Sequence, residues 1–346
     1  MLNVAVAGAS GYTGGELLRL LALHPYVKVV AVTSEKSSGK PITQLFPSLS
    51  RFYDLTLEPL SSEIAAGKAE FVFTALPHGT SVTPVSEFVK SGKMVVDLSA
   101  DFRLRDPLTY EEWYGVKHTA KDLLQSAVYG LPEIYRDRIK GASLVANPGC
   151  YPTASILSIA PLLKNGLYNG GKIIIDAKSA ISGAGRSPSL AFHFPEANEG
   201  MEAYKAGTHR HIPEIEQVLS DVAGNTVTTC FVPHLIPANR GLLTTGYVPS
   251  DFSGEAADIV RLYREFYDNE PFVRVLDAGR QPNIRDVKGA NFCDIGIALD
   301  KRNGCIIVTS AIDNLVKGSA GAAIQNMNIM KGYEETTGLM QPGLFP

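Results

Sequence analysis

Cys150 is the side chain in this sequence best placed to act as a nucleophile. It lies in the motif NPGCYPT, residues 147–153, directly before a stretch, 153–164, whose composition predicts a helix with Pro152 at its first position. N–H groups at a helix N-terminus stabilise a thiolate, and they can also stabilise an oxyanion formed beside it. The motif therefore predicts a nucleophilic thiol, although a structural cysteine in a turn fits the same local pattern.

The other three cysteines carry no such signal. Cys230, Cys293 and Cys305 lie inside apolar, strand-like runs, and we expect each to be a buried small hydrophobe. No Cys–Cys or Cys–His spacing is typical of a zinc site, so the sequence predicts no metal. Four scattered cysteines in 346 residues also do not form a disulfide framework.

A thiol that forms a thioester needs a proton donor and acceptor nearby, and the motif GTHRHIPE, residues 207–214, offers two imidazoles. Glu214 follows His211 by three residues, so its carboxylate could orient that ring, whereas His209 has no such partner in sequence. This spacing favours His211 over His209 as the acid/base without deciding between them. An N-capping loop with exposed histidines is the alternative. His24 follows a predicted surface helix and His118 lies in a polar stretch, so both are expected to face solvent.

A glycine-rich turn near the N-terminus predicts a dinucleotide site. Gly8, Gly11 and Gly14 follow an apolar run, 2–7, and precede a helical pattern, 16–23. Glycines allow the backbone to approach a pyrophosphate, and the helix N-terminus adds free N–H groups and a positive dipole. A strand–turn–helix without a ligand also uses such glycines, but the position directly after an N-terminal strand favours the cofactor interpretation.

The end of the next apolar run, 27–33, bears on the choice of cofactor. NAD sites usually place an acidic residue there, whereas NADP sites supply cations and hydroxyl groups for a 2′-phosphate. Glu35 is compatible with NAD. The surrounding Ser34, Lys36 and Ser37 favour NADP, with a solvated polar loop as the alternative.

The elements that must position these residues change in kind near residue 147. Before it, near-continuous apolar runs at 2–7, 27–33, 71–75 and 94–98 alternate with helical segments, which predicts a parallel sheet covered on both faces. After it, runs at 172–179, 226–233, 241–248, 292–299 and 305–312 predict a second, mixed sheet. A last helical segment, 318–330, is expected to return to the first domain.

Bulk composition excludes several classes of protein. A net charge of −3 gives no basic surplus with which to bind nucleic acid, and the longest apolar runs are far shorter than the roughly 20 residues of a membrane-spanning helix. The N-terminus lacks the basic segment of a signal or transit peptide. A cytoplasmic enzyme is the default expectation.

Taken together, four motifs resemble the N-acetyl-gamma-glutamyl-phosphate reductase family, which is related to aspartate-semialdehyde dehydrogenase. They are GASGYTG at 8–14, NPGCYPT at 147–153, SGAGR at 182–186 and GTHRHIPE at 207–214, and the similarity continues to DNLVKGSAG at 313–321. The resemblance implies NADPH-dependent reduction of N-acetyl-gamma-glutamyl phosphate to the 5-semialdehyde, with release of phosphate, through a Cys150 thioester in arginine biosynthesis. It implies an α/β fold with a Rossmann-type NADP-binding domain, residues 1–148 plus 315–346, and an α+β catalytic and oligomerisation domain, residues 149–314.

The resemblance and the motifs together assign expected roles to individual residues. The catalytic set is Cys150, His211, His209 and Glu214. The cofactor set is Gly8, Ser10, Gly11, Tyr12, Thr13, Gly14, Ser34, Lys36, Ser37, Ser182, Gly183 and Asn314, and the substrate set is Ser99, Arg103, Asn147, Gly185 and Arg186. A homodimer or homotetramer is expected. The alternatives are another acyl-phosphate reductase, such as aspartate-semialdehyde dehydrogenase, and a non-catalytic NADP-binding protein.

Overall fold

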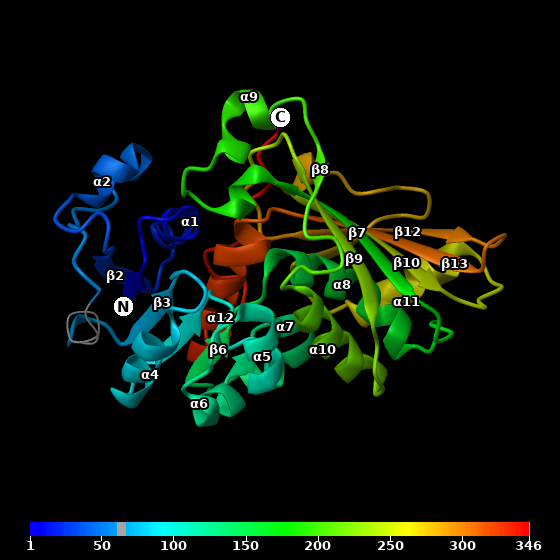
Figure 1. The fold of residues 1–346 in the computed structure, drawn as a ribbon, viewed down its shortest axis with the longest axis horizontal. Coiled ribbons are helices and arrows are strands. Elements are labelled where there is room, and N and C mark those ends of the chain that lie inside the picture. The colour runs from blue at the N-terminus through cyan, green and yellow to red at the C-terminus, as the bar shows by residue number, and fades with distance from the viewer. Residues whose placement is uncertain (61–66, 346) are drawn as a thin grey trace. The chain divides into compact units, whose positions relative to one another are not determined.

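The computed structural model describes residues 1–60 and 67–345, and the chain forms two compact units (Figure 1). The first unit comprises residues 1–149 and 319–340, and the second comprises residues 150–318 and 341–346. The sequence prediction assigned 1–148 and 315–346 to the first domain, but Gly149 groups with the first unit, and residues 315–318 and 341–346 group with the second. For the last residues the reason is local: Leu344 N donates to Lys288 O at 2.7 Å, and the Arg285 guanidinium lies over the Phe345 ring.

The first unit contains a six-stranded parallel sheet in the order β2-β1-β3-β4-β6-β5. Its strands are β1 (Leu2–Ala7), β2 (Val27–Thr33), β3 (Phe71–Thr74), β4 (Met94–Asp97), β5 (Val128–Tyr129) and β6 (Leu144–Ala146). Its helices are α1 (Tyr12–Leu21), α2 (Ile42–Leu45), α4 (Val82–Lys90), α5 (Pro107–Tyr114), α6 (Lys121–Ser126), α7 (Pro132–Ile139) and α12 (Gly321–Lys331). The four strands predicted from apolar runs are confirmed to within one residue at each end.

Helices cover both faces of this sheet because alternate side chains of each strand point to opposite sides. Val72 and Val95 pack in one buried cluster with Val85 and Phe88 of α4. On β3, the neighbouring side chains Phe71 and Phe73, which point the other way, are also fully buried. Helices α1 and α12 pack on strands β1 and β4 and on each other, so the C-terminal helix completes the first unit as predicted.

The second unit contains a seven-stranded mixed sheet in the order β11-β12-β13-β10-β7-β9-β8. Its strands are β7 (Ile173–Ala180), β8 (Glu202–Ala203), β9 (Thr229–Ile236), β10 (Leu242–Pro249), β11 (Val273–Val275), β12 (Cys293–Asp300) and β13 (Cys305–Ile312). Its helices are α8 (Cys150–Lys164), α9 (Phe194–Ala197), α10 (Ile212–Ala223) and α11 (Ala256–Phe266). The five predicted strands are confirmed, with ends shifted by up to three residues.

Helix α8 lies deep in the second unit, packed against β10 and β13 on one side and against α10 on the other. Residues 151–163 are all buried, and Tyr263 and Tyr267 of the α11 region donate their hydroxyl groups to backbone carbonyls of α8 at 2.5 and 2.6 Å. The helix begins at Cys150 and not at Pro152, so the predicted start is two residues late. Pro152 is tolerated because N–H groups of a first turn have no partner within the helix.

The opposite face of the second sheet is exposed. Ile174 is 42% and Tyr247 36% exposed, although both are large apolar side chains within strands. The expectation that three cysteines are buried is right only for Cys293, because Cys230 is exposed on β9 and Cys305 is half-buried.

The expected exposure of two histidines is also wrong. His24 and His118 are buried, since tertiary contacts not visible in the local sequence enclose both rings: His24 bonds Asn328 at 2.9 Å, and His118 bonds the Asp101 carbonyl at 2.9 Å.

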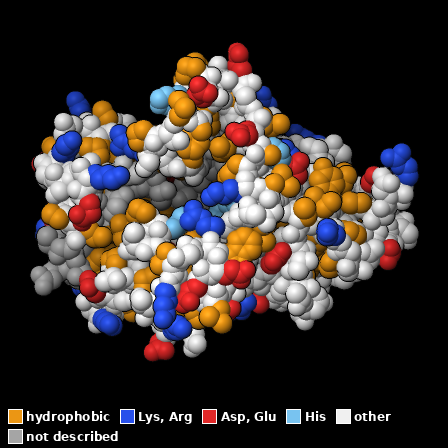
Figure 2. All heavy atoms as spheres, in the orientation of Figure 1, with side chains coloured by type: hydrophobic (Ala, Val, Ile, Leu, Met, Phe, Trp, Pro, Cys, Tyr) orange, Lys and Arg blue, Asp and Glu red, His pale blue; other side chains and the backbone are white. Residues whose placement is uncertain are grey.

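Two surface properties accompany this fold. Acidic and basic side chains are interspersed over the face drawn in Figure 2, which agrees with the net charge of −3. Across residues 1–60 and 67–345, every helix is too short or too polar to cross a bilayer.

Candidate active site

The glycine-rich turn between β1 and α1 packs closely against neighbouring backbone at Gly8 and Gly14 and is open at Gly11. Gly8 has a φ of +82°, and a Cβ there would lie 2.4 Å from Ala75 O. A Cβ at Gly14 would lie 2.6 Å from a backbone atom of the same turn, whereas at Gly11 the nearest atom would be 3.9 Å away. Helix α1 begins at Tyr12 without a capping side-chain hydrogen bond among the described residues. The N–H groups of its first turn are therefore open to an anion.

Hydroxyl groups gather beside this turn, at the ends of β1 and β2. Ser10 Oγ lies 2.8 Å from Ser34 Oγ, and Ser37 N donates to Ser34 Oγ at 3.2 Å. Lys36 projects from the same loop and is exposed. Thr13 Oγ1 lies 3.4 Å from a serine hydroxyl of the C-terminal segment. The predicted cofactor residues of the first unit thus share one edge of the sheet.

A buried carboxylate network, formed by Asp97 and Asp101, adjoins this edge. The Asp101 carboxylate accepts from Gly79 N at 2.7 Å, Ser81 N at 2.8 Å and Tyr110 OH at 2.9 Å. The Asp97 carboxylate accepts from the Ser81 hydroxyl at 2.7 Å. Burial raises the pKa of Asp97, against hydrogen bonds from hydroxyl groups that lower it. The network fixes the turn after β3, and a parallel sheet places ligands at the crevice where its strand order reverses, here between β1 and β3.

Three predicted substrate residues lie buried around the end of β4. Ser99 Oγ donates to the Asp97 carboxylate at 2.6 Å. Arg103 is 5% exposed, and its Nε and Nη2 donate to Asn147 O at 2.8 Å and Leu98 O at 2.9 Å. These bonds tie the segment after β4 to the segment after β6. The Arg103 guanidinium thus uses two of its donor atoms to position the backbone that leads to the thiol.

The thiol and the two imidazoles lie within the second unit. Cys150 is half-buried at the first residue of α8. The ring of its neighbour, Tyr151, lies 5.6 Å from the His209 ring and 5.9 Å from the His211 ring, centroid to centroid, and the imidazoles are 4.7 Å apart. Tyr204 OH donates to Tyr151 OH at 3.3 Å. The packing of α8 on α10 therefore brings together residues about 60 positions apart in sequence.

Hydrogen bonding and burial determine the protonation state of His209. His209 Nδ1 accepts from His211 N at 3.1 Å, and its ring packs edge-on against Tyr151, Tyr204 and Phe231. Burial, assisted by the positive charges of neighbouring basic residues, lowers the pKa of His209 to about 4. His209 is therefore neutral at pH 7 and is not a ready proton donor.

Two tyrosines adjoin the imidazoles, and a buried carboxylate lies in the helix that follows them. Burial raises the pKa of both Tyr151 and Tyr204, and a negative charge on Cys150 acts in the same direction. Glu214 is 1% exposed in the first turn of α10. Sequence reasoning missed Tyr151 and Tyr204 as site residues. For Tyr151 the signal was its place next to the cysteine, whereas Tyr204 has no local signal.

The loop 182–186 and Asn314 form a second polar group of the second unit. Asn314 Nδ2 donates to Ser182 Oγ at 2.9 Å, and Gly241 N donates to Asn314 Oδ1 at 2.8 Å, so both ends of the amide are engaged. Gly183 lies beside this contact. Gly185 has a φ of +86°, and both it and Arg186 are exposed. Across the described parts of the chain, His, Cys, Asp and Glu side chains form no group of three able to hold a metal ion.

Comparison with known proteins gives a consistent result. Residues 3–142 match the family of the semialdehyde dehydrogenase NAD-binding domain, and residues 150–314 match that of the semialdehyde dehydrogenase dimerisation domain. Proteins named N-acetyl-gamma-glutamyl-phosphate reductase from Geobacter metallireducens and Desulforudis audaxviator are 54% and 51% identical, with all of each chain covered. The solved aspartate semialdehyde dehydrogenase with NADP from Candida albicans has a TM-score of 0.73 at 17% identity, over 96% of this chain and 98% of its own. That structure is similar in fold.

Proposed function

Because the chain belongs to the N-acetyl-gamma-glutamyl-phosphate reductase family, we propose that it reduces N-acetyl-gamma-glutamyl phosphate to N-acetyl-L-glutamate 5-semialdehyde with NADPH and releases phosphate. The observation that carries the proposal is the position of Cys150. It is the first residue of a 15-residue buried helix, and the next side chain packs on both imidazoles. The substrate follows from the full-length relatives and their shared name.

The first step is the attack of the Cys150 thiolate on the acyl carbon. The bond to phosphate breaks, phosphate leaves with its electron pair, and a thioester remains on Sγ. N–H groups of the first turn of α8 stabilise the thiolate before attack and the oxyanion that forms during it. When bound, the dinucleotide supplies the hydride that reduces the thioester carbon.

The second step needs a proton at the carbonyl oxygen, and we assign it to His211. His209 is unsuited because its pKa of about 4 leaves it neutral at pH 7 and because its Nδ1 accepts from a backbone N–H. Glu214, one helical turn after His211, is assigned to orient that ring. The hemithioacetal then returns its hydroxyl proton to the same imidazole as its C–S bond breaks, so the Cys150 thiolate leaves and the aldehyde forms.

The first unit is proposed to hold NADP(H). The open backbone at Gly11 and the N–H groups of α1 fit a pyrophosphate. Ser34, Lys36 and Ser37 supply hydroxyl and cationic groups for a 2′-phosphate. The carboxylate that would instead favour NAD, that of Glu35, accepts from Leu60 N at 2.8 Å. The remaining first-unit residues of the predicted set are proposed to line the same site.

We also propose that the protein is a homodimer or homotetramer that associates through the exposed face of the second sheet. In the pairing of β7, β10 and β13, Ile174 lies opposite Tyr247 and Tyr247 lies opposite Ile307. The three side chains form one apolar row across these strands. Such a row is costly to leave in water. The cytoplasmic location stays a prediction.

The decisive experiment compares Cys150→Ser with Cys305→Ser in the reverse reaction, with N-acetylglutamate semialdehyde, phosphate and NADP⁺, read as NADPH absorbance. We expect Cys150→Ser to lose turnover while NADP⁺ binds within a few-fold of wild type, because a serine hydroxyl is far less ionised than a thiol. Cys305→Ser should keep turnover. Substantial activity in Cys150→Ser would disprove the thioester route. Activity of the wild type with aspartate semialdehyde in place of the acetylated substrate would favour the alternative enzyme.

A further inference from the structure

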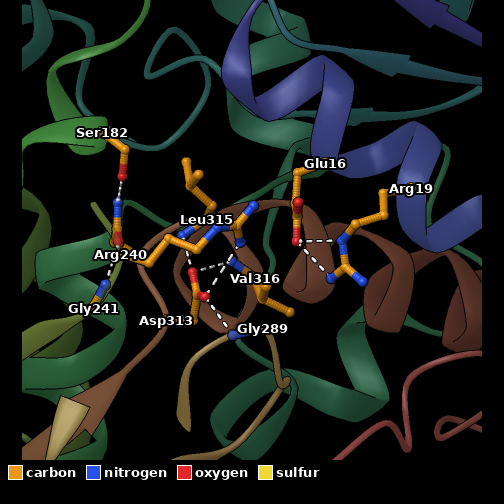
Figure 3. A network of polar contacts seen from close by, with 10 residues as sticks. Glu16, Arg19, Ser182, Arg240, Gly241, Gly289, Asp313, Leu315 and Val316 are labelled. Atoms are coloured by element: carbon orange, nitrogen blue, oxygen red, sulfur yellow. Dashed lines mark hydrogen bonds and ion pairs between the residues drawn. The ribbon is translucent and has the colours of Figure 1, made fainter. Parts of the chain in front are cut away.

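A buried carboxylate shapes the segment that follows β13. The Asp313 side chain is fully buried and accepts from Leu315 N at 2.8 Å, Gly289 N at 2.7 Å and Arg240 Nη1 at 3.3 Å (Figure 3). Its backbone carbonyl accepts from Gly318 N at 3.0 Å. Asp313 thus holds both ends of a turn that leads into a π-helical stretch, and such stretches are frequent at functional sites.

The turn brings Gly318 against the thiol-bearing residue. A Cβ on Gly318 would lie 2.8 Å from Cys150 Cβ, 3.2 Å from Cys150 Cα and 3.1 Å from Ile312 Cδ1. The φ of Gly318 is not in the left-handed region, so backbone conformation does not require glycine there. The lack of space requires glycine, because real Cβ atoms essentially never approach other atoms within 3.0 Å.

From this contact we infer that Gly318 is a positioning residue for the nucleophile. The backbone at Gly318 limits where the Cys150 Cβ can lie, and the hydrogen bonds of Asp313 to the turn hold that backbone in place. Any larger side chain must push Cys150 and the start of α8 away. This inference rests on the proposed role of Cys150 and adds a residue that touches the nucleophile without itself reacting.

The expected displacement can be taken from the contact distance. Ordinary van der Waals contact begins near 3.4 Å, so an alanine methyl group at 2.8 Å requires a shift of about 0.6 Å (3.4 minus 2.8 Å). A misplacement of about 1 Å at a reacting group can cost about 10²-fold in rate. We therefore expect Gly318→Ala to lower kcat by about 10- to 100-fold, with the KM for NADPH within about twofold of wild type, since the glycine-rich turn is unchanged.

A chemical readout tests the same inference without the substrate. The rate of Cys150 alkylation by iodoacetamide, measured against pH by mass spectrometry, reports the reactivity of the thiol. Gly318→Ala should change this rate or its pH midpoint. The matched control is Gly171→Ala, two residues before the start of β7. Its new Cβ would meet Pro249 at 2.9 Å, and the variant should leave both the alkylation rate and its pH midpoint unchanged. Equal kcat and equal alkylation in Gly318→Ala and wild type would overturn the inference.

A double variant separates the contact with the nucleophile from general crowding. Ile312→Val removes the Cδ1 atom that would meet the new methyl group, so Gly318→Ala/Ile312→Val should fold more readily and still be impaired, because the clash with Cys150 remains. Full recovery of activity and alkylation would show that the effect runs through Ile312, and the inference would be wrong. If wild type itself lacks reductase activity, the proposed function fails, and the alkylation rates still decide the role of Gly318.

Discussion

The low pKa of His209 has a direct consequence for stability. Its ring packs edge-on against three aromatic side chains, and partial burial is the largest cause of the decrease in pKa from 6.5 to about 4. In the unfolded chain the same ring binds a proton near pH 6.5. Between these two values the unfolded state therefore carries one more proton than the folded state, so acidification from pH 6.5 towards 4 removes stability, and the stability is complete above pH 6.5.

The size of the effect follows from the shift. A difference of about 2.5 pKa units at about 1.4 kcal/mol each sets an upper limit of about 3 kcal/mol. The ring retains some exposure, so we expect about 1–2 kcal/mol between about pH 7 and about pH 4.5. His209→Asn removes this contribution, and the asparagine amide oxygen can still accept from His211 N.

The measurement is urea unfolding of wild type and His209→Asn at both pH values, followed by circular dichroism. Carboxylates titrate in both proteins, so the informative quantity is the difference between their losses of free energy of unfolding. Wild type should lose about 1–2 kcal/mol more than His209→Asn. The control is His193→Asn, an exposed histidine of the same unit, which should lose as much as wild type. Parallel losses in wild type and His209→Asn would refute the assignment of a buried, neutral His209.

Three further outcomes follow from the proposed site. His211→Asn should lower the steady-state reduction rate by about 10²- to 10⁴-fold, the usual range for a general acid, and flatten one limb of the pH–rate profile; a rate near wild type would assign the proton to another group. Replacing Lys36 and Ser37 by alanine should raise the KM for NADPH more than that for NADH, and equal wild-type efficiency with both would contradict the interpretation of this loop. Light scattering should give at least twice the 37.2 kDa chain mass, and Ile174→Asp/Tyr247→Asp should shift it towards the monomer.

Local patterns of sequence predicted most of the secondary structure that carries the site. Strand β1 and the glycine turn after it could be predicted from neighbouring residues. An apolar run favours a buried strand, and the positive φ at residue 8 favours glycine. The proposed nucleophile, Cys150, was likewise indicated by its neighbours in sequence. Burial of Cys293 and exposure of Cys230 could not be separated, because both lie in similar apolar runs and differ only in which face of the sheet is covered.

The sequence by itself thus determined the two kinds of sheet, the glycine turn and the choice of Cys150 as a candidate nucleophile. Only the tertiary structure decided which groups surround that thiol. Tyr204 reaches Tyr151 across 53 positions, and Gly318 reaches Cys150 across a still longer stretch of chain. The low pKa of His209 is also tertiary in origin, since side chains from other elements enclose its ring. Burial and close packing arise from long-range contacts, and no local periodicity encodes them.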